Sequence, residues 1–277
     1  MGFASAELNT HEEAQQIKHT PTTKLATYLI GALCMAPAVA HSAAPERNTR
    51  VAIVGEAFHI TGAEGWTRLF DGETLAGWHV KRAKADRDKN FWTVEDGAIV
   101  CDSMHSTGHD YVWLMTDREY DDFELRMKVR SYADSPGNSG IQVRSRYDDE
   151  VEWLDGPQVD IHPPGGWRSG LIYDETRGHK RWIFPSLESS RIRPDQGPKE
   201  WKWNRDGWND VTIRCQGTHI LTKINGIVIA DYDGAGVLDD EWHEKYRVGM
   251  KGHIALQLHK GDRLRIAFKD IDLRPLR

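Results

Sequence analysis

The chain has 277 residues, of which 39% are hydrophobic and 28% are charged, and its formal net charge is −6. This mildly acidic composition argues against a nucleic-acid-binding or membrane-binding protein, because such proteins usually concentrate lysine and arginine. The length suits one large all-β domain or two small ones. All 11 tryptophans lie from Trp66 onward. We expect most of them to pack in a core and a minority to stack on a flat ligand such as a sugar ring.

Residues 1–40 have the pattern of a signal peptide. A polar stretch with two lysines precedes an apolar run at residues 25–39, and the segment ends in Ala-Val-Ala, which suits signal peptidase. The run is too short for a membrane span, which needs about 20 apolar residues. Cys34 offers a lipoprotein alternative, but Leu33 stands where a small residue is expected. We therefore predict an exported protein, periplasmic or extracellular.

Residues 41–63 carry weak patterning, and we interpret them as a linker with one possible edge strand at 51–54. The globular domain is predicted at residues 64–277. Its first clear signal is a hairpin at residues 91–101, which turns at Glu-Asp-Gly. Strict alternation of apolar and polar residues then predicts strands at 123–130 and 141–146.

Residues 156–177 hold two extended runs separated by Pro-Pro-Gly-Gly. The long aromatic and basic segment at 178–207 has little periodicity, and we expect it to cover or border a cleft. Farther along, Asn225-Gly226 predicts a hairpin with a type I′ turn. A short helical turn is expected within 238–246, and residues 254–259 alternate again.

Many short strands with turn signals every 8–12 residues predict an all-β fold, a two-sheet antiparallel jelly-roll sandwich. A domain of this length can bury a stable core as one unit. Cys101 and Cys215 each end an apolar run. A disulfide between them and two separately buried thiols both fit this pattern.

Three of the predicted strands place polar residues on one face and apolar residues on the other. The polar sets are Gln142, Arg144 and Arg146; Gln158, Asp160 and His162; and Gln257 and His259. If these strands are neighbours in one curved sheet, their polar faces merge into a cleft that could hydrogen-bond hydroxyl and carbonyl groups. The solvated faces of ordinary antiparallel strands show the same alternation.

The sequence resembles a secreted bacterial family known as the 3-keto-disaccharide hydrolase domain, formerly a domain of unknown function. The resemblance covers nearly all of residues 64–277, and it rests on the order and spacing of several short motifs. These are GWTRLFDGETLAGW (65–78), FWTVEDG (91–97), DFELRMKV (122–129), NSGIQVR (138–144), GPQVD (156–160), GLIYDETR (170–177), residues 208–217, Asn225-Gly226 and GHIALQLH (252–259). The family implies a fold of the concanavalin A-like lectin/glucanase type.

The resemblance also implies cleavage of small glycosides that a separate sugar 3-dehydrogenase has already oxidised at C3 of a glucose-type ring. The C3 ketone acidifies the C2 hydrogen, so a base can remove that proton while an acid protonates the departing glycosidic oxygen. Water added later makes the net result look like hydrolysis. This chemistry needs a base, an acid and a donor that polarises the ketone. It needs no redox cofactor.

On this basis, Asp160 and Glu175 are the expected acid/base pair, and His162 is an alternative proton carrier. Arg144 and Gln158 are expected to hold the ketone and ring hydroxyls. The remaining predicted substrate-binding residues are Tyr173, Arg177, Gln257 and His259.

Other interpretations stay open at this point. Asp160 could form a structural ion pair with Arg144, and Glu175 a surface pair with Arg177. Asp160, His162 and His259 could instead bind a divalent metal such as Mn²⁺ or Zn²⁺. The same fold could serve as a lectin-like binding module without turnover. A conventional retaining glucanase would need two carboxylates about 5–5.5 Å apart, with Glu175 reaching across from the neighbouring strand.

Overall fold

We describe the protein from a computed structural model, which defines residues 51–53, 58–60, 65–106, 108–187 and 190–276. The predicted signal peptide at residues 1–40 lies outside this described part. In the described part, none of the helices has the length and apolar character that a membrane crossing would require.

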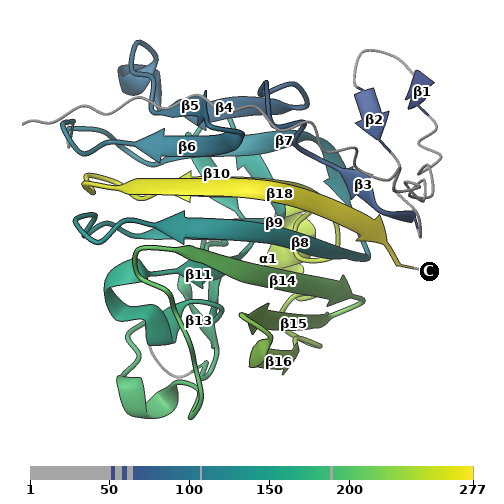
Figure 1. The fold of residues 1–277 in the computed structure, drawn as a ribbon. Coiled ribbons are helices and arrows are strands. Elements are labelled where there is room, and N and C mark those ends of the chain that lie inside the picture. Colours follow the sequence, from purple (N-terminus) through teal and green to yellow (C-terminus); the bar gives the residue numbers. More distant parts are fainter. Residues whose placement is uncertain (1–50, 54–57, 61–64, 107, 188–189, 277) are drawn as a thin grey trace, which may run out of the picture. The chain divides into compact units, whose positions relative to one another are not determined.

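Two antiparallel sheets of eight strands each form the body of the protein (Figure 1). The first sheet has the order β13-β12-β11-β9-β17-β7-β4, and β10 pairs with β9 outside this path. Its strands are β4 (Trp78–Arg82), β7 (Val112–Tyr120), β9 (Ser139–Asp148), β10 (Trp153–Asp155), β11 (Pro157–Ile161), β12 (Ile172–Asp174), β13 (Arg181–Phe184) and β17 (Gly252–Leu258).

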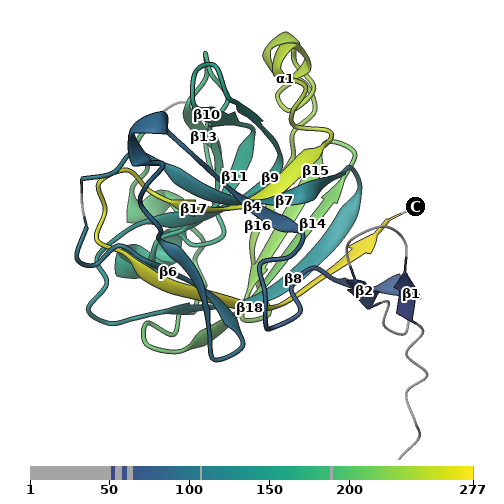
Figure 2. The same cartoon turned by 90° about the horizontal axis from the view of Figure 1, so that it is seen from above.

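The second sheet has the order β16-β15-β14-β8-β18-β6-β5, and β3 pairs with β18. Its strands are β3 (Thr67–Arg68), β5 (Trp92–Glu95), β6 (Ala98–Asp102), β8 (Phe123–Ser131), β14 (Trp208–Gln216), β15 (His219–Ile224), β16 (Ile227–Asp233) and β18 (Arg265–Pro275). The two sheets lie face to face (Figure 2). This arrangement confirms the predicted fold class, an all-β two-sheet sandwich.

The remaining described elements are short. They are the strands β1 (Val51–Ile53) and β2 (Phe58–Ile60), the α-helix α1 (Glu241–Tyr246), and the 3₁₀ helices η2 (Lys84–Asp86), η3 (Pro163–Arg168) and η4 (Pro194–Gln196). The edge strand expected near residues 51–54 is present as β1, but β1 pairs with β2 in a two-stranded sheet rather than with either large sheet. Helix α1 lies within the segment where a helical turn was expected.

Two tight hairpins form where the turn residues predict them. In the β5–β6 hairpin, Asp96 and Gly97 have φ values of 49° and 73°, and in the β15–β16 hairpin Asn225 and Gly226 have values of 50° and 82°. Positive φ at both central positions defines a type I′ turn, whose twist matches that of the flanking strands. The Asn-Gly prediction is therefore confirmed.

The alternating strand patterns explain the core. In β8, Phe123, Leu125, Met127 and Val129 all point into it, and they pack with apolar side chains of the facing sheet such as Val159. Burying a side chain of this size stabilises the fold by roughly 1.5–3 kcal/mol. Apolar residues on the inner faces thus hold the two sheets together.

Cys101 in β6 and Cys215 in β14 are both buried free thiols. Burial raises the pKa of Cys215 to about 12, so this thiol stays protonated. The strands that carry the two residues are not neighbours in their sheet. Of the two alternatives, separately buried thiols are correct and the disulfide is wrong.

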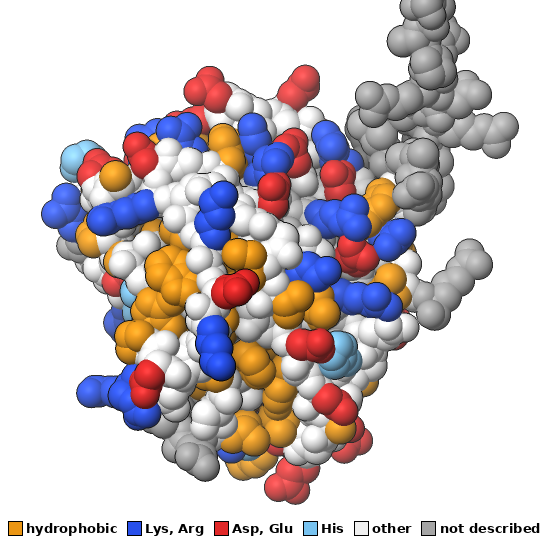
Figure 3. Space-filling model, turned by 60° about the horizontal axis from the view of Figure 1, so that its bottom comes forward, with side chains coloured by type: hydrophobic (Ala, Val, Ile, Leu, Met, Phe, Trp, Pro, Cys, Tyr) orange, Lys and Arg blue, Asp and Glu red, His pale blue; other side chains and the backbone are white. Residues whose placement is uncertain are grey.

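On the face shown in Figure 3, acidic and basic side chains are interspersed, with hydrophobic side chains between them. No patch of one charge sign dominates this face. It therefore lacks the concentrated positive field that nucleic-acid binding uses.

Candidate functional site

The three strands with polar faces lie side by side in the first sheet. Its order β12-β11-β9-β17 places β9 between the other two. Gln158 of β11 lies directly opposite Tyr173 of β12 and Gln142 of β9. These paired polar residues therefore share the side of the sheet away from the main core.

A cavity of about 460 Å³ opens on this side of the sheet. This volume falls within the usual range for small-molecule sites, roughly 300–1,000 Å³. Five of the predicted site residues line it: Gln158, Asp160, Tyr173, Glu175 and His259. The other lining residues are Tyr111, Asn138, Trp153, Arg168, Lys180, Trp182, Ser190, Arg191 and Ile192.

Gln158 is buried at the bottom of the cavity, and a glycine makes room for it. A Cβ added to Gly140 would lie 2.3 Å from Gln158 Cδ, so the side chain fits only because residue 140 has none. Gln158 Oε1 is buried and has no hydrogen-bond partner among the described residues. Because unsatisfied buried polar atoms are costly, this oxygen is well suited to accept a hydrogen bond from a ligand hydroxyl.

Asp160 is a buried carboxyl group held by an arginine. Arg168, at the end of η3, donates from Nε to Asp160 Oδ2 at 3.1 Å. Burial raises the pKa of Asp160 to about 6, although Arg168 and Asn138 oppose the shift. The Arg168 guanidinium also lies over the Trp182 ring, 5.2 Å from its centroid. An ionisable carboxyl group and a fixed cation thus occupy one end of the cavity.

Glu175 is the second buried carboxyl group, and its side chain is only 7% exposed. Burial raises the pKa of Glu175 to about 7, against the opposing charges of Lys180 and His259. Lys180 Nζ lies 3.3 Å from the centroid of the Trp153 ring. Trp153 Nε1 in turn donates to the Glu175 carbonyl at 2.8 Å, which fixes the backbone beside the carboxyl group.

His259 interacts electrostatically with both buried carboxyl groups and lowers the pKa of each. Burial lowers the pKa of His259, but Asp262, whose Oδ2 lies 3.5 Å from His259 Nδ1, outweighs this effect, and the net pKa is raised. Tyr111 Oη lies 3.1 Å from His259 Nε2. Burial raises the pKa of Tyr111, so its phenol keeps its proton. This pair could donate or relay a proton at the cavity wall.

The strand register sets the backbone offset of the two residues that carry the carboxyl groups. Asp160 follows Gln158 by two residues, and Glu175 follows Tyr173 by two residues on an antiparallel strand. The two Cα atoms are therefore offset by four residue steps, or about 13 Å along the strands at ~3.3 Å per residue. Gln158 and Tyr173 therefore lie between Asp160 and Glu175 in the strand register, and all four residues line the cavity.

Aromatic rings form one wall. Tyr111 stacks on Trp113 with ring centroids 5.5 Å apart, and Trp153 meets Tyr111 edge to face at 5.1 Å. Tyr111 and Trp153 both line the cavity. Rigid aromatic faces beside hydrogen-bonding groups are suited to a sugar ring.

Arg144 does not line this cavity. It has a φ of 49°, and the register between β9 and β17 shifts by one residue between the pairs Ala255–Gln142 and His253–Ser145. Such a bulge turns the side chain to the other face of the sheet. The buried guanidinium donates to Asp121 O, Gly217 O and Asp122 Oδ1. This placement does not fit the expected roles in holding the ketone or pairing with Asp160.

Three other predicted residues also lie outside the cavity lining. Arg177 donates to Asp155 and Asp148 and so ties down the loop after β12. Gln257 is fully buried, and neither side-chain polar atom has a hydrogen-bond partner among the described residues. His162 precedes η3, and burial together with Arg168 lowers its pKa to about 4, which makes it a neutral group.

Several lining residues could not be assigned from the sequence. Arg168 follows the Pro-Pro-Gly-Gly break and reaches back to Asp160 through η3. Lys180 and Trp182 come from the segment at 178–207, which borders the cavity as expected but also contains strand β13. The signal for this segment was its aromatic and basic composition, which did not identify individual side chains.

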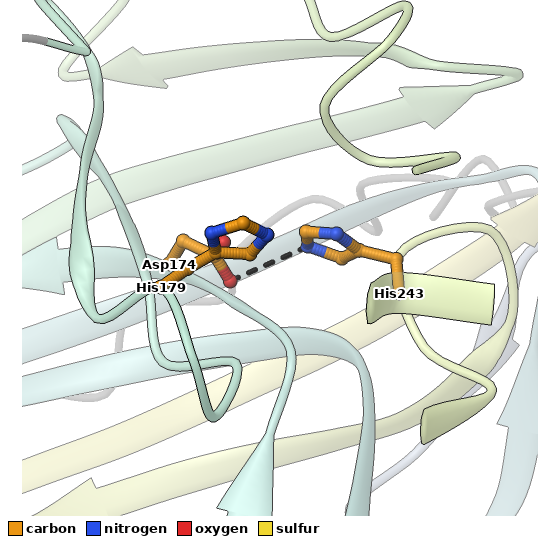
Figure 4. Close-up of side chains that lie close together, drawn as sticks. All are labelled: Asp174, His179 and His243. Atoms are coloured by element: carbon orange, nitrogen blue, oxygen red, sulfur yellow. Dashed lines mark ion pairs between the residues drawn. The ribbon is translucent and has the colours of Figure 1, made fainter. Parts of the chain in front are cut away.

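A potential metal-ligand group lies apart from the alternative set considered from the sequence. Among the described residues, the one group of three or more histidine, cysteine or acidic side chains close enough to share an ion is Asp174, His179 and His243 (Figure 4). The alternative set of Asp160, His162 and His259 does not form such a group.

The fold is similar to that of solved structures of low sequence identity. The chain is similar to a protein of Parabacteroides distasonis with a provisional glycosyl hydrolase assignment, at 18% identity and a TM-score of 0.54, over 78% of this chain and 96% of that one. It is also similar to the carbohydrate binding module CBM66 from Bacillus subtilis, at 11% identity and a TM-score of 0.46, over 72% and 95% of the two chains.

A Bacillus subtilis protein of unknown function with a galectin-like fold is similar at 12% identity and a TM-score of 0.42, over 71% of this chain and 94% of that one. No curated protein matches the chain. The decisive match is to a family's sequence model, the 3-keto-alpha-glucoside-1,2-lyase-like domain, over residues 65–274. This match confirms the resemblance seen in the motifs, and the chain belongs to the family of 3-keto-alpha-glucoside-1,2-lyase-like domains.

Proposed function

We propose that the protein is an enzyme that cleaves the glycosidic bond of 3-keto-glucosides, including 3-keto-disaccharides, by acid/base 1,2-elimination. The observation that carries the proposal is the pair of buried carboxyl groups that line one cavity, with pKa values raised to about 6 at Asp160 and about 7 at Glu175. Groups with pKa values near neutrality exchange protons most effectively under physiological conditions. Family membership supplies the substrate class.

The two carboxyl groups suit different roles. Arg168 donates to the Asp160 carboxyl group and favours its ionised form, so Asp160 serves as the base. Glu175, whose pKa burial raises to about 7, serves as the acid. Arg168 beside Asp160 would stabilise negative charge on the C3 oxygen, which is bonded to the carbon next to C2. The C2 and C3 atoms of the substrate therefore belong beside Asp160, and the leaving group beside Glu175.

The reaction then follows in balanced steps. Asp160 takes the C2 proton, and the electron pair forms the enolate of the C3 ketone. The enolate electrons move back to form the C1–C2 double bond as the C1–O bond breaks, and Glu175 protonates the departing oxygen. Addition of water across the double bond would give free 3-keto-glucose, so the sum is hydrolysis.

The register does not favour a conventional retaining glucanase. Two carboxylates in that mechanism lie about 5–5.5 Å apart. The Asp160 and Glu175 backbones are offset by about 13 Å along their strands, so both side chains would have to lean toward each other to reach that distance. A lectin-like module would use the same cavity without turnover. The predicted signal peptide would place the enzyme outside the cytoplasm, and a separate sugar 3-dehydrogenase would supply its substrate.

Turnover of an aryl 3-keto-glucoside tests this proposal. Asp160→Asn and Glu175→Gln should each lower kcat by about 10²–10⁴-fold, the usual contribution of a positioned acid or base. The matched control is Asp117→Asn, an exposed carboxylate outside the cavity whose side chain is 56% exposed. If both site variants cleave the substrate at the control rate, the assignment is wrong. If wild type binds the glycoside without cleaving it, the protein is a binding module.

A further inference from the structure

A second cluster of chemically competent side chains lies apart from the cavity. Asp174 ends β12, His179 follows in the next loop and His243 belongs to α1 (Figure 4). One ligand atom from each residue lies within 4.8 Å of the others. The three side chains come from segments up to 69 positions apart in the sequence, so the fold brings them together.

One carboxylate orients both imidazoles. Asp240 Oδ1 lies 2.8 Å from His243 Nδ1, and Asp240 Oδ2 lies 2.9 Å from His179 Nε2. When these two ring nitrogens donate their protons to Asp240, the other nitrogen of each ring keeps a lone pair. On His243 this is Nε2, which lies 3.3 Å from Thr176 Oγ1, a hydroxyl that can donate to it. Metal-binding histidines almost always have such a carboxylate or carbonyl partner on their second nitrogen, because it fixes the tautomer and the ring orientation.

The remaining carboxylate has an unused oxygen. Asp174 is fully buried, and its Oδ2 has no hydrogen-bond partner among the described residues. Its Oδ1 accepts a hydrogen bond from Thr176 N at 3.0 Å and lies 3.4 Å from His243 Nε2. Leaving a buried carboxylate oxygen without a partner is costly. A cation held between this oxygen and the two imidazoles would remove that cost.

We propose that Asp174, His179 and His243 bind one divalent transition-metal ion, for which Zn²⁺ is the best match. Two imidazoles and one carboxylate form an established ligand set for Zn²⁺, with a further position open to water. The same set also suits other first-row metals such as Fe²⁺ and Co²⁺. The ion would clamp α1 to the end of β12 and to the loop behind Glu175. This proposal does not depend on the proposed glycoside chemistry.

The rival explanation is a purely structural ion-pair network. In that case His243 carries two protons and bridges Asp174 and Asp240, and no ion is needed. The two contacts of such a bridge differ in length. His243 Nδ1 lies 2.8 Å from Asp240 Oδ1, whereas His243 Nε2 lies 3.4 Å from Asp174 Oδ1, so the bridge is loose on the Asp174 side. Metal affinity separates the two explanations, because a protonated imidazole has no lone pair to offer on Nε2.

The test uses the full-length protein after dialysis against a chelator. Zn²⁺ binding is measured by calorimetry and metal content by mass spectrometry, and Co²⁺ serves as a probe because its visible absorption reports coordination by imidazole and carboxylate. Wild type should bind one ion per chain. His179→Gln should bind at least 10-fold more weakly. This side chain is 15% exposed, so its replacement is less disruptive than that of the fully buried His243.

Two further variants complete the test, one in the residue that orients the imidazoles and one as a control. Asp240→Asn keeps a side-chain oxygen to cap α1 but weakens its hold on both imidazoles, and it should lower affinity about 10- to 100-fold. His219→Gln is the control, because His219 is an exposed histidine paired with Asp231 away from the cluster. If wild type takes up neither Zn²⁺ nor Co²⁺, or if His179→Gln binds as tightly as His219→Gln does, the metal site does not exist.

Discussion

Gln158 and Tyr173 face each other across β11 and β12, and this pair separates the two buried carboxyl groups of the cavity. Asp160 lies two residues beyond one partner, and Glu175 lies two residues beyond the other in the opposite direction. Burial raises the pKa of both carboxyl groups toward neutrality, and the proposed mechanism uses one as a base and the other as an acid. The arrangement leads to several experimental expectations.

The first concerns the pH dependence of turnover. The enzyme needs Asp160 ionised and Glu175 protonated, so kcat/KM should rise as pH increases through about 6 and fall as pH increases through about 7. These values belong to a coupled pair rather than to isolated groups. Initial rates between pH 4 and pH 9 measure the profile. A rate that keeps rising above pH 8 would contradict the acid role of Glu175.

The second expectation links activity to stability at Glu175. The folded protein raises the pKa of this group from 4.5 to about 7. Its stabilising contribution is therefore fully present below about pH 4.5 and is lost as pH rises through about 7. Glu175→Gln cannot ionise, so at pH 8 it should be more stable than wild type by about 3 kcal/mol. Near pH 4.5 the two proteins should unfold alike. Urea denaturation at both pH values measures the difference, and equal stability at pH 8 would show that Glu175 is not buried in its charged form.

The third expectation concerns the space beside Gly140 that the Gln158 side chain fills. A Cβ at this position would lie 2.3 Å from Gln158 Cδ, so Gly140→Ala should displace the glutamine side chain. We expect kcat/KM to fall by about 10- to 100-fold, because small displacements of positioning groups cost that much. Gly108→Ala is a matched control, since an added Cβ there meets no atom within 4 Å. Equal kinetics for both variants would mean that Gln158 does not position the substrate.

The fourth expectation tests the structural role of Arg144. Its fully buried guanidinium holds Asp122 and three backbone carbonyls, so Arg144→Met should destabilise the fold by about 3–5 kcal/mol. Arg193→Met should change stability by less than about 1 kcal/mol, because Arg193 forms an exposed pair with Asp195. The folded fraction of Arg144→Met should retain normal KM. A stable Arg144→Met protein with greatly raised KM would restore the substrate-binding role.

Much of the fold follows from local sequence patterns. Strand periodicity identifies the inner face of β8, and Asn225-Gly226 specifies its turn because few other residues adopt positive φ at both positions. The polar face of β11 could also be predicted from the sequence, because Gln158 and Asp160 alternate with Val159 and Ile161. These features depend on neighbours within a few residues, which is why sequence alone suffices for them.

The site is less predictable because it depends on irregular backbone and on long-range contacts. One additional residue in β9 turns Arg144 away from the cavity. Arg168 reaches Asp160 only through the short helix η3, and His259 meets Tyr111 from a position 148 residues away. Periodicity contains no information about a bulge or about which distant strand supplies a partner.

The most direct test of the proposed chemistry is product analysis by NMR in deuterated water, with a 3-keto-glucoside and its unoxidised parent treated side by side. Elimination removes the C2 proton, so the 3-keto-glucose product should carry deuterium at C2 beyond the exchange seen without enzyme, or the unsaturated intermediate should accumulate. The unoxidised glucoside should remain intact. Cleavage of the unoxidised glucoside alone, or release of 3-keto-glucose that keeps its original C2 proton, would contradict elimination at Asp160 and Glu175.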